Sequence, residues 1–161
     1  MIADSFTATY LVDRTPEEVL DAILDVRSWW SGDLDGPTRE VGDVFEYRFQ
    51  DIHYSRIRVE QVTPHRVTWR VTDNHLSFVE DQDEWVDTQI VFDIEPTVGA
   101  TRLTFTHDGL LPDFECYDAC QQGWSMYATG SLKQLLRSGT GDPAGDGRAR
   151  TAAEAALLDG S

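Results

Sequence analysis

The chain has 161 residues, of which 40% are hydrophobic and 26% are charged, and these values fit one globular domain. No apolar run approaches the roughly 20 residues that span a membrane, and the N-terminus has neither the basic nor the apolar segment of a secretory signal. Because 29 acidic residues stand against 13 basic ones, the formal net charge of −16 disfavours binding to nucleic acid or to an anionic membrane.

The chain begins with a predicted strand and a predicted helix. In residues 5–12 apolar and polar side chains alternate, which is typical of a strand with one buried face. Thr15 and Glu18 have the spacing of a capping box, and Pro16 suits the first helical position. The apolar residues that follow recur at helical spacing, so we expect a helix to about Asp25.

Between residues 43 and 107 the apolar side chains recur at every second position in five separate runs. Each run is expected to be buried on one side and solvated on the other, as in an antiparallel sheet. Turn signals such as Asp73-Asn74 separate the runs, and the acidic stretch 80–84 is expected in a long hairpin between the third and the fourth. The bulky inward side chains are Phe45, Tyr47, Phe49, Trp69, Phe92 and Phe105.

Towards the C-terminus, a long helix is expected from Pro112 to about Ser138, closed by Gly139. Its apolar stripe consists of Cys116, Tyr117, Cys120, Trp124, Tyr127, Ser131 and Leu135. Beyond it, a composition rich in Gly and Ala predicts a mobile tail, residues 141–161, after a packed domain of residues 1–140.

These elements predict an α+β fold: a curved antiparallel sheet of about six strands wraps around the long C-terminal helix, with one or two short helices after the first strand. The reason is that one apolar sheet face must be covered and one long helix is available to cover it. Large rings on both walls, with Gly123 and Gly130 removing bulk from the helix, could leave an apolar cavity, the usual makeup of a small-molecule site. The alternative is a sealed core, since protein interiors normally pack at a density of ~0.74.

Several short motifs accompany these elements along residues 5–143. They are Pro16-Glu17-Glu18-Val19, Trp29-Trp30, Val41-Gly42-Asp43-Val44-Phe45, Glu84-Trp85, Phe105-Thr106-His107-Asp108-Gly109-Leu110, Glu115-Cys116-Tyr117-Asp118 with Trp124, and Ser131-Leu132-Lys133 with Gly139. In order and spacing they resemble the helix-grip fold of the START/SRPBCC superfamily, and most closely its branch related to the C-terminal domain of the activator of the ninety-kilodalton heat-shock protein ATPase. The resemblance implies a hydrophobic cavity between the sheet and the C-terminal helix that binds lipids, polyketides or other planar apolar molecules.

We therefore predict a non-catalytic protein that binds a small, largely apolar molecule and needs no cofactor. Tyr117 and His107 are expected to orient a polar end of that molecule. Trp29 and Trp30 either gate the entrance or pack in the core. The walls are expected to be Tyr47, Trp69, Phe92, Phe105, Trp124 and Tyr127.

Two other functions stay open. One is a chaperone-associated interaction domain that uses the outer surface, and the other is a cyclase or dehydratase that uses His53 and His107, which by strand parity point inward. Cys116 and Cys120 face the same way, but zinc needs three or four ligands and His107 alone could join them, so we expect no metal site. Two cysteines are too few for a disulfide framework, which favours a cytoplasmic location.

Overall fold

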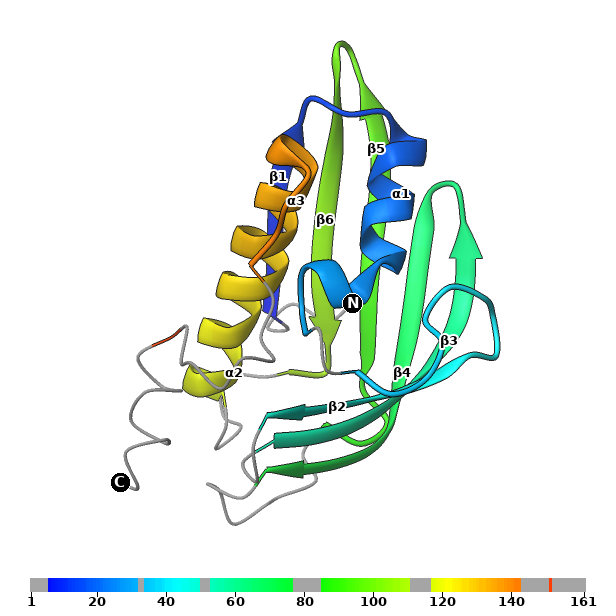
Figure 1. The fold of residues 1–161 in the computed structure, drawn as a ribbon, viewed down its shortest axis with the longest axis vertical. Helices are drawn as coiled ribbons and strands as arrows, with labels where there is room; N and C mark the ends of the chain where they lie inside the picture. Colours follow the sequence, from blue (N-terminus) through cyan, green and yellow to red (C-terminus); the bar gives the residue numbers. More distant parts are fainter. Residues whose placement is uncertain are drawn as a thin grey trace.

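The computed structural model describes residues 6–31, 34–49, 53–76, 85–110 and 117–142, together with Thr151. Within these residues six strands form one antiparallel sheet in the spatial order β1-β6-β5-β4-β3-β2 (Figure 1). The strands are β1 (Phe6–Val12), β2 (Val44–Phe49), β3 (His53–Thr63), β4 (Arg66–Leu76), β5 (Gln89–Thr97) and β6 (Ala100–Asp108). The helical segments are α1 (Pro16–Leu24), the 3-10 helix η1 (Val26–Ser28), α2 (Tyr117–Trp124), η2 (Ser125–Ser131) and α3 (Leu132–Ser138).

The predicted fold class is confirmed. The C-terminal helix lies along the concave side of a curved sheet, and two short helices, α1 and η1, follow the first strand (Figure 1). The alternation expected from the sequence is also present. In β6, for example, Leu103, Phe105 and His107 are fully buried, and Phe105 and His107 lie opposite Phe92 and Ile90 of β5. The apolar faces of neighbouring strands therefore form one continuous inner surface.

The curvature of the sheet has a local cause. The ladder between β4 and β5 extends from Arg66 to Arg70 and then ends, so the two halves of the sheet are joined over a short stretch. Register shifts in the β3–β4 pair, between Arg56 and Ile57 and again after Val59, mark bulges, which increase the local twist. As a result β2 and the adjoining ends of β3 and β4 run crosswise to β1 and β6 (Figure 1).

The first helix begins as predicted. The hydroxyl of Thr15 accepts a hydrogen bond from the amide of Glu18 (3.1 Å), and the carboxylate of Glu18 accepts one from the amide of Thr15 (3.0 Å). This capping box supplies acceptors to two amides near the helix start. The helix α1 ends at Leu24, one residue before the predicted end, and buries Val19, Ile23 and Leu24.

The C-terminal helix differs from a uniform α-helix. Its middle part, η2, winds as a π-helix, and the amide of Leu132 bonds to the carbonyl of Tyr127, five residues earlier. The wider turn shifts the buried stripe by one residue. Leu132 and Leu136 are buried, whereas Leu135, which a period of 3.6 placed on the stripe, is half-buried. Gly139, with φ of 84°, ends α3 as predicted and donates its amide to the carbonyl of Leu135.

The two glycines of this helix lie in different surroundings. Gly130 is exposed, and a Cβ built on it would meet the carbonyl of Ser125 and the sulfur of Met126, both in its own helix. Gly123 is half-buried, and a Cβ built there would have no described atom within 4 Å. For the exposed Gly130 the expectation that it removes bulk facing the sheet is therefore wrong, whereas for Gly123, which has open space at its Cβ position, it stays a prediction.

Beyond α3 the chain packs back against the helix as far as Asp142. The amide of Asp142 donates to the hydroxyl of Ser131 (2.7 Å). Gly141 lies so close to the carbonyl oxygen of Ser28 that a Cβ would come within 2.2 Å of it. Close approach of backbone to backbone therefore requires glycine at this position.

Some predictions concern parts of the chain outside the described residues and stay predictions. The boundary between the packed domain, 1–140, and the tail, 141–161, is one of them. The others concern the acidic stretch 80–84, the helix start at Pro112 and the side chain of Cys116.

Candidate functional site

Nine of the described aromatic side chains lie in contact between the concave sheet face and the C-terminal helix, and we call them the aromatic layer. Five come from strands, three from connecting segments and one from α2, and none is more than 2% exposed. The layer consists of Trp29, Trp30, Phe45, Tyr47, Trp69, Trp85, Phe92, Phe105 and Trp124.

Trp30 lies at the centre of the aromatic layer. Its ring stacks on Tyr47 of β2, with ring centres 4.4 Å apart, and contacts Trp124 of α2 at 4.8 Å. Trp29 and Trp30 are nearly parallel to Trp69 of β4, with interplanar angles of 8° and 11°. Both rings are buried among other aromatic side chains, and their role as an entrance stays a prediction.

The other predicted wall residues surround this centre. Phe92 and Phe105 lie opposite each other on β5 and β6 with ring centres 5.3 Å apart, and Phe105 contacts Trp124 at 4.8 Å. Tyr127 is buried on η2, one turn beyond Trp124. Tyr117, at the start of α2, is half-buried and packs against the core.

His107 uses both ring nitrogens inside the protein. The indole Nε1–H of Trp124 donates to Nδ1 of His107 (3.0 Å), so Nδ1 is the unprotonated nitrogen and the proton sits on Nε2. That Nε2–H bonds to the hydroxyl of Thr88 (2.7 Å), and the hydroxyl donates in turn to the carbonyl of Trp85 (2.6 Å). This chain of hydrogen bonds selects one neutral tautomer and joins α2, β6 and the turn before β5.

A second polar group reaches the same end of the aromatic layer. The side-chain amide of Asn74 donates to the hydroxyl of Ser55 and to the carbonyl of Tyr54, both at 3.1 Å, and its oxygen accepts from the backbone amide of Trp85 (3.2 Å). The hydroxyl of Ser55 is also hydrogen-bonded to Nε2 of His53 (2.8 Å). These contacts fix the position of the Trp85 backbone.

Both imidazoles are neutral at pH 7. Burial lowers the pKa of His53 and of His107 from 6.5 to about 3, and the neighbouring His53 further lowers the pKa of His107. The ring of Trp85 contacts both imidazoles, at 4.7 Å and 4.6 Å. A general acid or base works best with a pKa near the operating pH and must reach the substrate. The geometry therefore gives no support to the interpretation of these histidines as an acid–base pair.

Trp85, Thr88 and Asn74 are the residues of this region that sequence reasoning did not place in the site. Trp85 and Thr88 lie in a connection, where no periodicity assigns a side chain to a face. Asn74 was expected in a turn, but it lies within β4, because its side chain bonds to β3 and to the chain at Trp85. The turn prediction for Asp73-Asn74 is therefore wrong. The motif Glu84-Trp85 was the available sequence signal.

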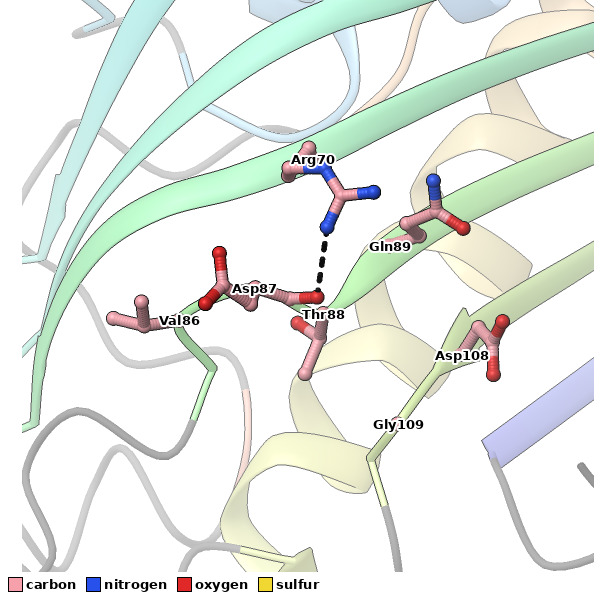
Figure 2. Close-up of a pocket in the computed structure, with 7 residues that line it drawn as sticks. All are labelled: Arg70, Val86, Asp87, Thr88, Gln89, Asp108 and Gly109. Atoms are coloured by element: carbon pink, nitrogen blue, oxygen red, sulfur yellow. Dashed lines mark hydrogen bonds between the residues drawn. The ribbon is translucent and has the colours of Figure 1, made fainter.

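A hollow of about 410 Å³ opens on the outer side of the sheet, next to this end of the aromatic layer (Figure 2). The guanidinium of Arg70 spans it from β4 and donates to the carbonyl of Asp87 (3.1 Å). The hydroxyl of Thr88, which bonds to His107, separates the hollow from the buried rings. Its lining is Arg70, Val86, Asp87, Thr88, Gln89, Asp108 and Gly109, so the hollow is polar and unlike the apolar site that the sequence predicts.

Residues 13–137 match the family model described as Activator of Hsp90 ATPase homolog 1-like protein. The chain belongs to this family. The resemblance inferred from the sequence motifs is therefore confirmed. No curated protein matches the chain.

Solved structures share the fold of this family member. The Aha1 dimer from Colwellia psychrerythraea is 22% identical, with a TM-score of 0.67, over 85% of this chain and 98% of its own. Protein MLL2253 from Mesorhizobium loti is 21% identical, with a TM-score of 0.63, over 81% and 96%. DynU16, a protein of the dynemicin biosynthetic locus, is 21% identical, with a TM-score of 0.60, over 86% of this chain and 49% of its own. At these identities the likeness shows the fold alone.

Two observations bear on membranes and metals. Across the described ranges, the structure contains no helix with the length and apolarity needed to cross a membrane. In the same part of the chain, no three His, Cys, Asp or Glu side chains are grouped so that they could hold a metal ion. Cys120 is buried on α2.

Proposed function

We propose that this protein binds a small, planar, largely apolar molecule in the aromatic layer and acts as a binding protein without catalysis. The observation that carries the proposal is the position of Trp30. A flat ring from a connecting segment lies between Tyr47 of the sheet and Trp124 of the helix, at 4.4 Å and 4.8 Å. A flat ligand in this place would stack on Tyr47 and contact the tilted ring of Trp124.

The origin of the rings suggests how a ligand enters. Trp30 and Trp85 belong to connecting segments, whereas Tyr47, Trp69 and Trp124 belong to strands and to α2. Connections open at lower free-energy cost than the elements they join. Displacement of either connecting indole would therefore open the layer without breaking the sheet ladder or the helix.

A chaperone partner is the second candidate, and the family description supports it. The outer sheet face would be the docking surface. Its arginines bond to acidic side chains of the same face, as in the pair between Arg66 Nε and Asp93 at 2.7 Å, so its charge is largely compensated. An increase in the ATPase rate of a ninety-kilodalton chaperone on addition of this chain would establish that function.

The low cysteine content supports the cytoplasm as the place of action.

Ligand titration tests the binding proposal. Planar tricyclic molecules of the flavone type and a fatty acid are added to the full chain, while the five indole N–H resonances are followed by NMR. We expect the planar molecules to shift the resonances of Trp30 and Trp124 at micromolar concentration. If none of them perturbs the aromatic layer at high micromolar concentration, the proposal is wrong.

Two variants provide the matched comparison. Tyr47→Leu keeps an apolar side chain but removes a stacking ring, and we expect roughly fivefold weaker binding of planar ligands. Val98→Ala changes a fully exposed residue at a hairpin, and we expect unchanged binding. Equal loss of affinity in both variants would contradict a site next to Tyr47.

A further inference from the structure

Among the described residues, two hydrogen-bond donors of the aromatic layer have no acceptor. The indole Nε1–H groups of Trp69 and Trp85 are buried, and no atom of the described chain accepts from either. Two other indoles follow the usual rule for buried polar groups. The indole of Trp29 donates to a backbone carbonyl (3.2 Å), and that of Trp124 donates to Nδ1 of His107 (3.0 Å).

The acceptors around Trp85 already serve other donors. The side-chain oxygen of Asn74 accepts from the backbone amide of Trp85, and Nδ1 of His107 accepts from Trp124. The carbonyl of Trp85 itself accepts from the hydroxyl of Thr88. A molecule bound beside the Trp85 indole would supply the acceptor that the described residues do not provide.

The surroundings also restrict the charge of that molecule. No Lys or Arg is buried within the described ranges. His53 and His107, which contact the ring of Trp85, are neutral because burial lowers the pKa of each to about 3. A carboxylate placed here would lose its hydration without gaining a positive partner, which is strongly unfavourable.

We propose that the molecule bound in the aromatic layer is uncharged and carries a carbonyl-type oxygen that accepts a hydrogen bond from the indole N–H of Trp85. A longer molecule with a second oxygen would also bond to the indole of Trp69. This inference rests on the proposed function and adds the ligand class. Planar ketones, quinones and lactones fit it, whereas aromatic hydrocarbons and fatty acids do not.

Three probes with one ring system separate these classes. Fluorene has no acceptor, 9-fluorenone has one ketone oxygen, and fluorene-2-carboxylate has a negative charge. Each is titrated into the full chain with ¹⁵N-labelled tryptophan. We expect fluorenone to bind about fivefold more tightly than fluorene, as one net hydrogen bond allows, and at least about tenfold more tightly than the carboxylate.

The indole protons report the contact directly. We expect fluorenone, but not fluorene, to move the Trp85 proton downfield. The protons of Trp29 and Trp124, which already have acceptors, should lack this difference. The variant Trp85→Phe should lose the preference for the ketone and keep its affinity for fluorene, whereas Trp29→Phe should keep the preference. If Trp85→Phe does not fold, the response of the Trp85 indole proton to fluorenone in the wild-type chain tests the proposed hydrogen bond instead.

The possible failures are distinguishable. Equal affinities for fluorene and fluorenone, with an unmoved Trp85 proton, overturn the ligand class and leave the binding function in place. Absence of binding by all three probes overturns both. A Trp85 proton that shows contact with a buried water and does not respond to fluorenone identifies water as the acceptor and overturns the ligand class.

Discussion

Acidification from pH 8 to pH 5 should destabilise the protein by about 2 kcal/mol through His107 alone. This side chain is fully buried, and burial lowers its pKa from 6.5 to about 3. Below pH 6.5 the unfolded chain therefore binds a proton at this histidine, whereas the folded chain binds it only below about pH 3. Each pH unit in this window costs about 1.4 kcal/mol, so the interval from pH 6.5 to pH 5 costs ~2 kcal/mol. Above about pH 7.5 the contribution vanishes because both states are neutral.

The hydrogen bonds act in the same direction as burial. Protonation of His107 would place a second N–H on Nδ1, where the indole N–H of Trp124 already points. Two N–H donors would then face each other. Among the described residues, no buried acidic side chain lies in the core to compensate the positive charge of the protonated ring. Both effects therefore lower the pKa of His107 in the folded state.

Urea unfolding at pH 8, 7, 6 and 5 measures the effect, with wild type compared with His107→Gln. Glutamine does not titrate, so the difference in free energy of unfolding between the two should shrink by about 2 kcal/mol as the pH falls to 5. His53 is present in both chains, so its contribution cancels from the difference in free energy of unfolding. His65→Gln, at an exposed turn position, controls for the loss of an imidazole. A wild-type minus variant difference that stays constant with pH would refute the reasoning.

Four further variants are tested by urea unfolding near pH 8. Thr88→Val keeps the shape but leaves Nε2–H of His107 without its acceptor, so we expect a loss of about 1–3 kcal/mol, and no loss would contradict the hydrogen-bond chain. Tyr10→Phe removes a partly buried hydroxyl that donates to a carbonyl of η2 (2.8 Å), and we expect a loss of about 1 kcal/mol; an unchanged free energy would argue against that contact. Gly123→Ala should stabilise by up to about 1 kcal/mol because the position is helical and open. Gly141→Ala should destabilise because its Cβ would lie 2.2 Å from a backbone oxygen, and equal effects of the two glycine changes would contradict the packing beyond α3.

Features that depend on neighbours in the chain were predictable. The capping box of Thr15 and Glu18 needs two side chains three residues apart, and the structure contains both of its hydrogen bonds. The inward direction of Phe105 and His107 follows from strand alternation, which is a property of the backbone itself. Gly139 ends the last helix because the left-handed conformation there suits glycine.

Two local predictions failed, for different reasons. Asn74 has the chemistry of a turn residue, but β3 supplies acceptors for its amide, and the strand continues through it. The C-terminal helix was expected to keep one period, but the π-helical turn moves burial from Leu135 to Leu136. For Asn74 the deciding contacts come from residues that lie far along the chain, whereas the π-helical turn departs from the period of 3.6 that the sequence analysis assumed.

By itself, the sequence determined the order of the elements, the buried face of each strand and the family, because these depend on spacing along the chain. It also determined that many large rings lie on the inner faces. Only the tertiary structure decided which rings meet: Trp30 lies between Tyr47 and Trp124, and His107 bonds to Trp124 and Thr88. These partners come from separate elements, and their distances depend on how the curved sheet closes on the helix, which no local pattern encodes.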